Sequence, residues 1–210
     1  MGKIITLGVT GASGAALART ALRLLEADAA VSRIHLIVSE AGQRLIAQEL
    51  GVVATDSKQL PALLSGTRAE KTELLSNKDI GASIASGSYT VDGMIVLPCS
   101  AGTLASIANG TSDDLLARAA DVCLKERRPL VLCLRETPLN RVHLANMLRA
   151  QEAGAVIMPV IPAFYYAPQT IDDLIEQFVC RALAQLGLPQ NQQYRWEGHA
   201  DRPKSRTRHA

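Results

Sequence analysis

Five short runs of apolar residues, separated by stretches with helical periodicity, set the strongest limit on how this chain can fold. The runs are apolar at every position rather than at alternate positions, which is typical of strands covered on both faces. Strands that alternate with helices favour a parallel sheet with helices on both sides. The predicted strands are Ile4–Val9, Ile34–Val38, Gly93–Leu97, Leu130–Leu134 and Ala155–Val160. The predicted helices are Ala15–Glu26, Ala41–Leu50, Leu104–Ala108, Asp113–Glu126, Val142–Ala153 and Ile171–Leu186.

Length and composition indicate one α/β domain. The chain has 210 residues, enough to bury a single core, and we find no internal repeat and no linker. Residues 52–92 are the least informative part: Leu60–Leu64 is a candidate short helix, and residues 82–88 are too small and polar to belong to a core. We expect the domain to span residues 1–197. The basic tail at 198–210 lacks periodicity, and we expect it to be disordered.

Composition also argues against several functional classes. A net charge of +2 gives no bulk attraction to nucleic acid. No signal peptide opens the chain, and no apolar run reaches the ~18 residues that a membrane span needs. Two isolated histidines, His35 and His143, do not make a metal site. Four scattered cysteines without a CxxC motif are expected to be reduced core residues of a cytoplasmic protein: Cys99, Cys123, Cys133 and Cys180.

The turn after the first predicted strand is a candidate anion site. The sequence Thr10-Gly-Ala-Ser-Gly14 leads from that strand directly into a helix. A helix N-terminus offers free backbone N–H groups and the positive end of the helix dipole, and phosphate is a common occupant. The glycine spacing is not that of dinucleotide enzymes, and the P-loop lysine is missing. A tight connection without a ligand is the alternative interpretation.

Polar side chains follow each predicted strand, where an open α/β sheet binds its ligands. The second strand ends at Ser39, the third leads into Pro98-Cys-Ser-Ala-Gly-Thr103, and the fourth leads into Arg135-Glu136. The fifth leads to Phe164-Tyr-Tyr166, three of the seven aromatic residues of the chain. Together these five strand ends predict a ligand site at the carboxyl edge of the sheet.

The residues at this edge favour a mononucleotide such as FMN. A dinucleotide reader usually carries an acid at the end of the second strand, and Ser39 stands there instead. Two serine-rich helix N-termini and Arg135 suit one phosphate and a polyhydroxyl chain. Ordinary helix capping is the alternative for the serines. Solvated surface charges are the alternative for four basic side chains, Arg118, Lys125, Arg127 and Arg181, and an exposed ion pair is the alternative for Glu136.

Seven segments in order resemble the UbiX-type flavin prenyltransferases, some of which are named phenylacrylic or hydroxyarylic acid decarboxylase subunits. The likeness covers residues 3 to about 197. It rests on Thr10-Gly-Ala-Ser-Gly14, Ser86-Gly-Ser88, Pro98-Cys-Ser100 with Thr103, Arg118-Ala-Ala-Asp-Val122, Leu124-Lys-Glu-Arg-Arg-Pro-Leu130, Arg135-Glu-Thr-Pro138 and Pro162-Ala-Phe-Tyr165.

The resemblance implies a three-layer flavodoxin-like or Rossmann-like fold and a metal-independent prenyltransferase. Such enzymes join a dimethylallyl group from dimethylallyl monophosphate to N5 and C6 of reduced FMN. The prenylated flavin then serves a UbiD-type decarboxylase, in ubiquinone synthesis or aromatic acid breakdown. The resemblance further implies a homododecamer with its sites between subunits.

The resemblance also assigns roles to individual residues. FMN would lie against Gly11, Ala12, Ser13, Ser39, Ser100, Ala101, Gly102, Thr103, Arg118 and Arg135. The prenyl phosphate would lie against Lys125, Arg135, Tyr165, Arg181 and Trp196. The catalytic groups would be Ser13, Glu49, Lys125, Glu136 and Tyr165, with Glu136 as the relay for the C6 proton.

Two other functions are open to a chain of this pattern. A flavin-dependent cysteine decarboxylase shares the architecture, but it would carry an Asn-Thr pair where this chain reads Cys99-Ser-Ala-Gly-Thr103. It would also need a catalytic histidine, and neither His35 nor His143 follows a predicted strand. A non-catalytic FMN-binding subunit of a decarboxylase is the other alternative, although it would not need the second phosphate site that Lys125 and Arg181 suggest.

Overall fold

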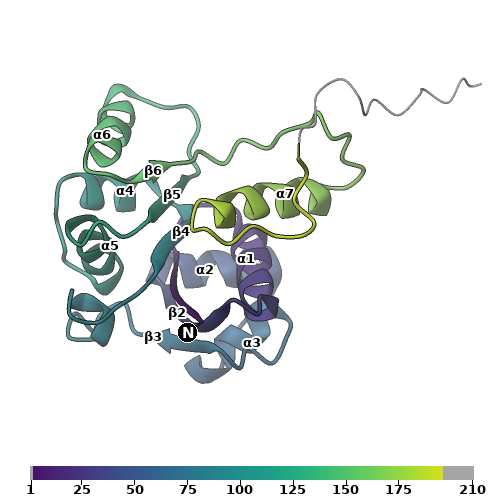
Figure 1. Cartoon of the computed structure of the whole chain (residues 1–210), viewed down its shortest axis with the longest axis horizontal. Coiled ribbons are helices and arrows are strands. Elements are labelled where there is room, and N and C mark those ends of the chain that lie inside the picture. The colour runs from purple at the N-terminus through teal and green to yellow at the C-terminus, as the bar shows by residue number, and fades with distance from the viewer. Residues whose placement is uncertain (1, 196–210) are drawn as a thin grey trace, which may run out of the picture.

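Six parallel strands form one sheet in the order β3-β2-β1-β4-β5-β6 in the computed structural model, which describes residues 2–195 (Figure 1). The strands are β1 Lys3–Val9, β2 Val31–Val38, β3 Thr72–Leu75, β4 Gly93–Cys99, β5 Leu130–Leu134 and β6 Val156–Ile157. The helices are α1 Ala15–Ala27, α2 Glu40–Leu50, α3 Leu60–Ser65, α4 Ala101–Ala108, α5 Leu115–Lys125, α6 Arg141–Glu152 and α7 Ile171–Ala184, with 3-10 turns η1 Ser57–Gln59 and η2 Ser83–Ala85. This strand order is the one found in Rossmann-type sheets.

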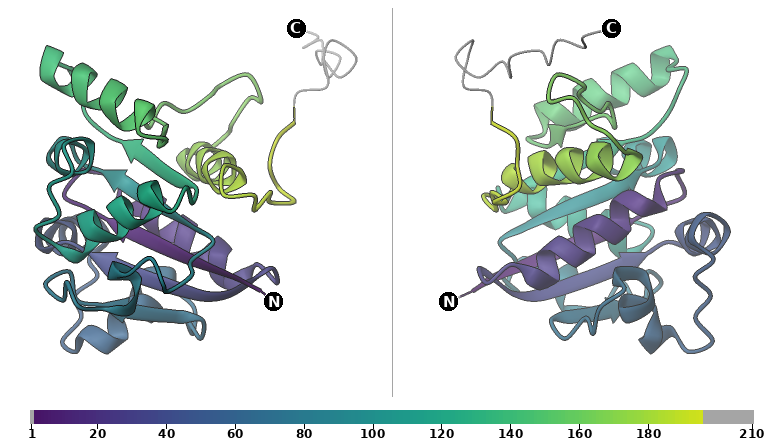
Figure 2. Two further views of the ribbon diagram at one scale, coloured as in Figure 1. Left: turned by 60° about the vertical axis from the view of Figure 1, so that its left-hand side comes forward. Right: turned by 90° about the vertical axis from the view of Figure 1, so that its right-hand side faces the viewer.

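Two hydrophobic cores cover the two faces of the sheet, as predicted from the fully apolar strands. Side chains of α1, α3 and α7 pack on one face with Ile5, Leu7 and Val9 of β1. Side chains of α4 and α5 pack on the other face with the alternate residues of β4 and β5. Figure 2 shows the helices as layers on either side of the strands. All seven residues of β4 are buried, which confirms that this strand is covered on both faces.

The structure differs from the prediction at three places. The strand β3 was not predicted, because this half-exposed edge strand has no continuous apolar run. Only Val156–Ile157 of the fifth predicted strand forms β6, although Met158 N–H and Val160 N–H still bond the carbonyl groups of β5. The prediction for residues 82–88 was wrong at Ile84, which is 2% exposed and packs in the second core.

The cysteines, the absence of a predicted membrane span and the C-terminal tail are the remaining predictions to compare with the structure. All four cysteines are buried and unpaired, and burial raises the pKa of the Cys99 and Cys123 thiols to about 12. Within residues 2–195 no helix is both long and apolar enough to cross a membrane. Trp196 and the basic tail at 198–210 lie outside the described residues.

Candidate functional site

One threonine ties together the two loops at the centre of the carboxyl edge. Thr10 Oγ1 donates to the Pro98 carbonyl at 2.9 Å and accepts from Ser100 N–H at 2.8 Å. Thr10 N–H also bonds the Pro98 carbonyl at 3.2 Å. The side chain is 2% exposed, so these bonds are shielded from water. They hold the loop after β1 beside the loop after β4, where the strand order reverses and a ligand crevice forms.

Small residues occupy the two loops that Thr10 ties together. A Cβ atom added to Gly102, at the start of α4, would meet no atom within 4 Å. A Cβ at Gly11 would lie 2.5 Å from the Ala41 side chain, so α2 approaches the first loop closely. Ser100 accepts from Thr103 N–H at 3.2 Å and bonds its hydroxyl at 3.0 Å. The two loops therefore offer hydroxyl groups at the helix N-terminus of α4, with open space beside Gly102.

Ser39 and Ser100 both cap helices, and capping was the alternative to ligand binding in the sequence analysis. Ser39 accepts from Gly42 N–H at 3.0 Å and begins α2, and its own N–H bonds the Val9 carbonyl at 2.9 Å. Capping uses each hydroxyl oxygen as an acceptor. The same serines border the crevice, so capping and ligand binding are compatible here.

The predicted phosphate cradle at the start of α1 holds a carboxylate from its own chain. Glu49 of α2 accepts from Ala15 N–H at 2.7 Å and from Gly14 N–H at 3.0 Å. Gly14 is the N-cap and has no side chain to do this, so Ser13 is not the helix cap. The N-terminal N–H groups of α1 are thus already paired with an anion, which the sequence did not predict.

The environment of Glu49 keeps its carboxylate ionised. Partial burial alone would raise the pKa, but the N–H groups of Ala15 and Gly14, the Ser13 hydroxyl and the Arg135 charge outweigh it. The net effect is a pKa below the ordinary value of 4.5. Ser13, Glu49 and Arg135 therefore form one polar cluster beside the crevice.

The end of β5 lines a cavity of about 430 Å³ that contains Arg135 and Glu136. Arg135 N–H bonds the Cys99 carbonyl at 3.0 Å, which fixes this strand end against β4. The Glu136 carboxylate is exposed, and Thr137 N–H donates to it at 3.0 Å. Both predicted side chains are thus at the carboxyl edge, where Glu136 is exposed and Arg135 is half-buried.

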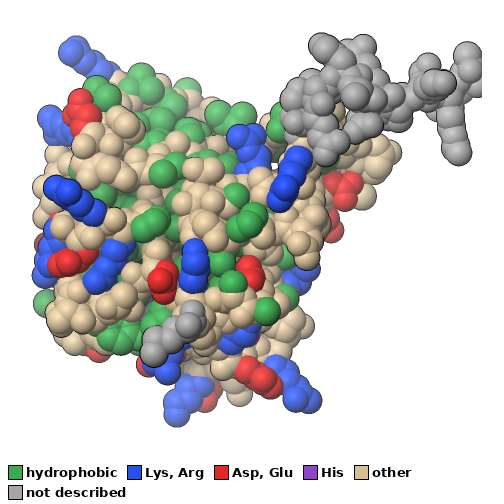
Figure 3. Space-filling view, in the orientation of Figure 1, with side chains coloured by type: hydrophobic (Ala, Val, Ile, Leu, Met, Phe, Trp, Pro, Cys, Tyr) green, Lys and Arg blue, Asp and Glu red, His purple; other side chains and the backbone are tan. Residues whose placement is uncertain are grey.

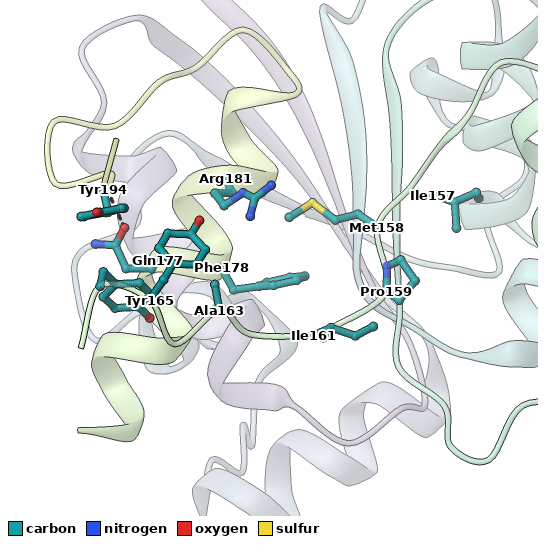
Figure 4. Close-up of a pocket in the computed structure, with 11 residues that line it drawn as sticks. Ile157, Met158, Pro159, Ile161, Ala163, Tyr165, Gln177, Phe178, Arg181 and Tyr194 are labelled. Atoms are coloured by element: carbon teal, nitrogen blue, oxygen red, sulfur yellow. Dashed lines mark hydrogen bonds between the residues drawn. The ribbon is translucent and has the colours of Figure 1, made fainter. Parts of the chain in front are cut away.

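A second cavity, of about 210 Å³, adjoins the first and contains Tyr165 and Arg181 (Figure 4). Pro159 and Ile161 line both cavities, so the two lie side by side. One end of the second cavity is apolar, with Ile157, Met158 and Pro159, and the Arg181 side chain lies between this end and the tyrosines. An apolar surface beside a cation and phenol groups suits a small ester with an anionic head.

Lys125 and Arg118 do not join this cluster within one chain. Lys125 ends α5 just before β5 begins, and Arg128 binds the carbonyl groups of Gly87 and Tyr89, which precede β4. Lys125 therefore lies at the amino edge of the sheet. The five residues of β5 separate it by about 17 Å from the carboxyl edge, where Arg135 lies. It pairs with Glu126 at 2.7 Å.

The Arg118 side chain binds residues near its own helix, α5, and not the carboxyl edge. Its Nε donates to the Ala85 carbonyl at 3.1 Å and its Nη1 pairs with Asp121 at 2.9 Å. The structure thus gathers Ser13, Glu49, Arg135, Glu136, Tyr165 and Arg181 along one edge and leaves Lys125 and Arg118 elsewhere.

Three residues of the second cavity were missed by the sequence prediction. Tyr194, Gln177 and Phe178 all line it. Gln177 and Phe178 lie one turn before Arg181 on α7, and that spacing was a usable signal. Tyr194 follows α7 in a segment without periodicity, so only the fold reveals its place. Among residues 2–195 no cluster of three metal-binding side chains is present.

The chain is similar to known flavin enzymes over nearly its whole length. Residues 1–182 match the family model described as "Flavoprotein". The "Flavin prenyltransferase UbiX" of Salmonella typhimurium is 46% identical over 198 residues, 93% of this chain and 99% of the relative.

Solved structures agree with that relationship. The crystal structure of AnUbiX in complex with FMN and dimethylallyl pyrophosphate is 41% identical, with a TM-score of 0.83 over 94% of this chain and 99% of that one. A dodecameric FMN-dependent UbiX-like decarboxylase from Escherichia coli O157:H7 is 40% identical, with a TM-score of 0.81 over 93% and 100%. The cysteine decarboxylase TvaF is only 14% identical at a TM-score of 0.58 and shares the fold alone.

Proposed function

The chain belongs to the flavoprotein family and, within it, to the UbiX flavin prenyltransferases, and from this we propose that it joins a dimethylallyl group from dimethylallyl monophosphate to N5 and C6 of reduced FMN. One geometric observation supports the proposal most. A cavity with Arg135 and Glu136 and a pocket with an arginine and tyrosines adjoin along the sheet edge at which the small hydroxylated loops after β1 and β4 also lie. Binding of a flavin alone would not require the second pocket.

The crevice fits FMN by its own geometry. Gly102 leaves open space where a larger residue would project, and the nearby helix N-termini and Arg135 suit a phosphate. Because Glu49 already occupies the N-terminus of α1, we place the FMN phosphate toward Ser39, Ser100 and Arg135 rather than in the Gly11–Gly14 turn. When bound, the reduced flavin supplies the nucleophilic N5 and C6 atoms.

The second pocket fits the prenyl donor. The allylic C–O bond breaks, phosphate leaves with the bonding pair, and the dimethylallyl carbons bond to N5 and C6. One proton leaves N5 and one leaves C6, while the former double bond gains one and phosphate takes the other. Arg181 and the Tyr165 hydroxyl stabilise the departing phosphate. The aromatic side chains stabilise the allylic cation.

Proton transfer falls to Glu136, which follows Arg135 of the polar cluster in the chain; Ser13 lies beside Glu49 in that cluster. The Glu136 carboxylate is solvent-accessible and lines the cavity next to the donor pocket. A carboxylate so placed can accept the C6 proton and pass it to water. Glu49 holds Ser13 and the start of α1 in position.

Lys125 and Arg118 reach a phosphate only from a second copy, because they lie away from the cluster in their own chain. We therefore propose a homo-oligomer, with a dodecamer as in the Escherichia coli O157:H7 relative. The helix α6 supports this: it buries Asn146 and exposes Leu144 and Leu148, the reverse of a helix on a free surface. Figure 3 shows hydrophobic side chains along the edge where α6 and β6 lie.

The recipient of the product is proposed to be a UbiD-type decarboxylase in the cytoplasm. Adding the reaction mixture to such a decarboxylase freed of its cofactor should restore decarboxylation. A mixture prepared without the prenyl donor is the control.

Anaerobic incubation of the pure protein with reduced FMN and dimethylallyl monophosphate tests the main proposal. Mass spectrometry should show a flavin heavier by one isoprene unit, with release of inorganic phosphate. Bound FMN of unchanged mass would refute the transferase and leave a non-catalytic flavin carrier.

A further inference from the structure

Two arginines bind the carbonyl groups of one loop, residues 85–89, which leads from η2 toward β4. Arg118 of α5 donates through Nε to the first carbonyl of this loop at 3.1 Å. Arg128, just after α5, donates through Nη2 to the Gly87 carbonyl at 2.7 Å and through Nη1 to the Tyr89 carbonyl at 2.8 Å. The 85–89 loop is therefore fixed along the C-terminal end of α5.

A buried histidine holds the far end of the same loop. The Tyr89 hydroxyl and His35 Nε2 form a hydrogen bond of 2.9 Å, and the two rings meet edge on with their centroids 5.5 Å apart. His35 lies on β2 and is 0% exposed, so the tyrosine has a fixed partner inside the fold. The other ring nitrogen of His35 lies 3.3 Å from Glu73 Oε2 of β3. The 85–89 loop is thus tied to the sheet as well as to α5.

Gly87 is the point at which this loop meets Lys125. A Cβ atom added at Gly87 would lie 2.7 Å from Lys125 Nζ and closer still to Glu126 Oε1, too close for nonbonded atoms. The ammonium and the carboxylate, which pair at 2.7 Å, therefore lie in the space that a side chain at position 87 would fill. Glycine is the residue that lets this pair rest directly on the loop.

Contact with the loop gives an exposed lysine a defined position. A free lysine side chain samples many rotamers, and a ligand that orders it must offset the lost entropy. Resting on Gly87 restricts the Lys125 side chain before any ligand arrives, which favours binding by preorganisation. The Lys125 side chain is still 45% exposed, so an anion from outside the chain can reach it.

We propose that the 85–89 loop positions Lys125 for the phosphate of the prenyl donor, with Gly87 as the point of contact. This inference rests on the proposed prenyl transfer and adds positioning residues that lie away from the carboxyl edge. Arg128 and Tyr89 act only through the loop, and His35 acts only through Tyr89. A buried bond on the sheet thereby sets the place of a charge at the surface.

Gly87→Ala is the most direct test, because the nearest atoms to the added methyl group are the ends of two flexible side chains. Gly87 does not have a positive φ, so the variant should fold. In the assembled protein, the KM for dimethylallyl monophosphate should rise about tenfold through a weakened bond to a charged phosphate. The Kd for FMN should not change. Gly81→Ala is the matched control, since its Cβ would meet only Asp79 Oδ1, at an ordinary 3.4 Å.

The same substitution in a Lys125→Ala background separates positioning from a general structural effect. Gly87→Ala should raise the donor KM no further there, because the side chain through which it acts is gone. An equal rise with and without Lys125 would overturn the proposal. So would a wild type that prenylates the flavin together with a Gly87→Ala variant of unchanged donor KM, and that result would leave the prenyl transfer intact. Absence of prenylation in the wild type would instead overturn the proposed function and, with it, this role of Lys125.

Hydrogen exchange of the loop gives a readout that does not depend on turnover. Tyr89→Phe keeps the ring but removes the hydroxyl that bonds His35. Amides of the 85–89 loop should then exchange about two- to tenfold faster, as expected for the loss of one hydrogen bond, while those of α1 should not change. The donor KM should rise by a similar factor. Unchanged exchange and unchanged KM in Tyr89→Phe would refute the part of the proposal that involves His35 and Tyr89.

Discussion

Replacing Glu49 tests whether the N-terminus of α1 depends on a carboxylate from α2. Glu49→Ala removes acceptors for two helix N–H groups at 2.7 and 3.0 Å. Loss of a capping acceptor costs roughly 0.5–2 kcal/mol. Loss of a negative charge at a helix N-terminus costs roughly a further 0.3–1 kcal/mol. We therefore expect the free energy of unfolding to fall by about 1–3 kcal/mol, and by less in Glu49→Gln, which keeps one acceptor oxygen.

Denaturant titration at a fixed protomer concentration measures this difference, with Gln48→Ala as the exposed control on the same helix. For a chain of this length each kcal/mol also lowers Tm by about 2–4 °C. The difference depends on pH because the pKa of Glu49 is lowered in the folded protein. The stabilisation is complete above the ordinary value of 4.5 and is lost as the pH falls through the lowered folded value.

Phosphate provides a further check on the same helix end. In Glu49→Ala the freed N–H groups of Gly14 and Ala15 should bind inorganic phosphate, so phosphate should stabilise this variant more than the wild type. A stability difference between the wild type and Glu49→Gln that stays constant from neutral pH to below the carboxylate pKa would refute the reasoning. So would a Glu49→Ala variant as stable as the wild type.

Four further outcomes are expected. Glu136→Gln should retain FMN, seen by its absorbance, while prenylation slows about 10²–10⁴-fold; normal turnover would exclude the relay. Tyr165→Phe should raise the KM for the donor roughly tenfold through loss of a bond to a charged phosphate, without changing FMN binding. Leu148→Glu should reduce the assembly to smaller species in sedimentation, because it charges the exposed face of α6. Burial lowers the pKa of His35, although the Glu73 charge acts in the opposite direction. Stability should therefore fall as the pH drops below 6.5, the ordinary pKa of histidine, and His35→Gln should reduce this pH dependence in denaturant titrations.

The sequence predicted the parts of the fold that depend on local pattern. Strands buried on both faces are apolar throughout, so β1, β2, β4 and β5 were identified, whereas β3 is a half-exposed edge strand without that pattern. The residues that follow the strands were expected to lie together, because the ends of parallel strands meet at one edge of the sheet. Arg135, at the end of β5, lies there as expected.

Contacts between distant segments were not predicted. Glu49 binds a turn that lies 35 positions earlier in the chain, and no local periodicity encodes that bond. Tyr194 is held at the pocket by a hydrogen bond from its N–H to the Gln177 side chain of α7. The position of Lys125 was within reach of the sequence, since a helix that leads directly into a parallel strand must end at the amino edge of the sheet.

The Thr10 hydroxyl divides the binding site into a fixed part and an adjustable part. Because one buried oxygen both donates across the crevice and accepts back from it, the loops after β1 and β4 cannot separate without breaking two shielded bonds at once. Any change of shape on ligand entry must therefore come from the opposite side, where Tyr166 and Tyr194 are held by exposed hydrogen bonds to Asp173 and Gln177 of α7. Substitutions near Thr10 should consequently alter whether a flavin binds at all.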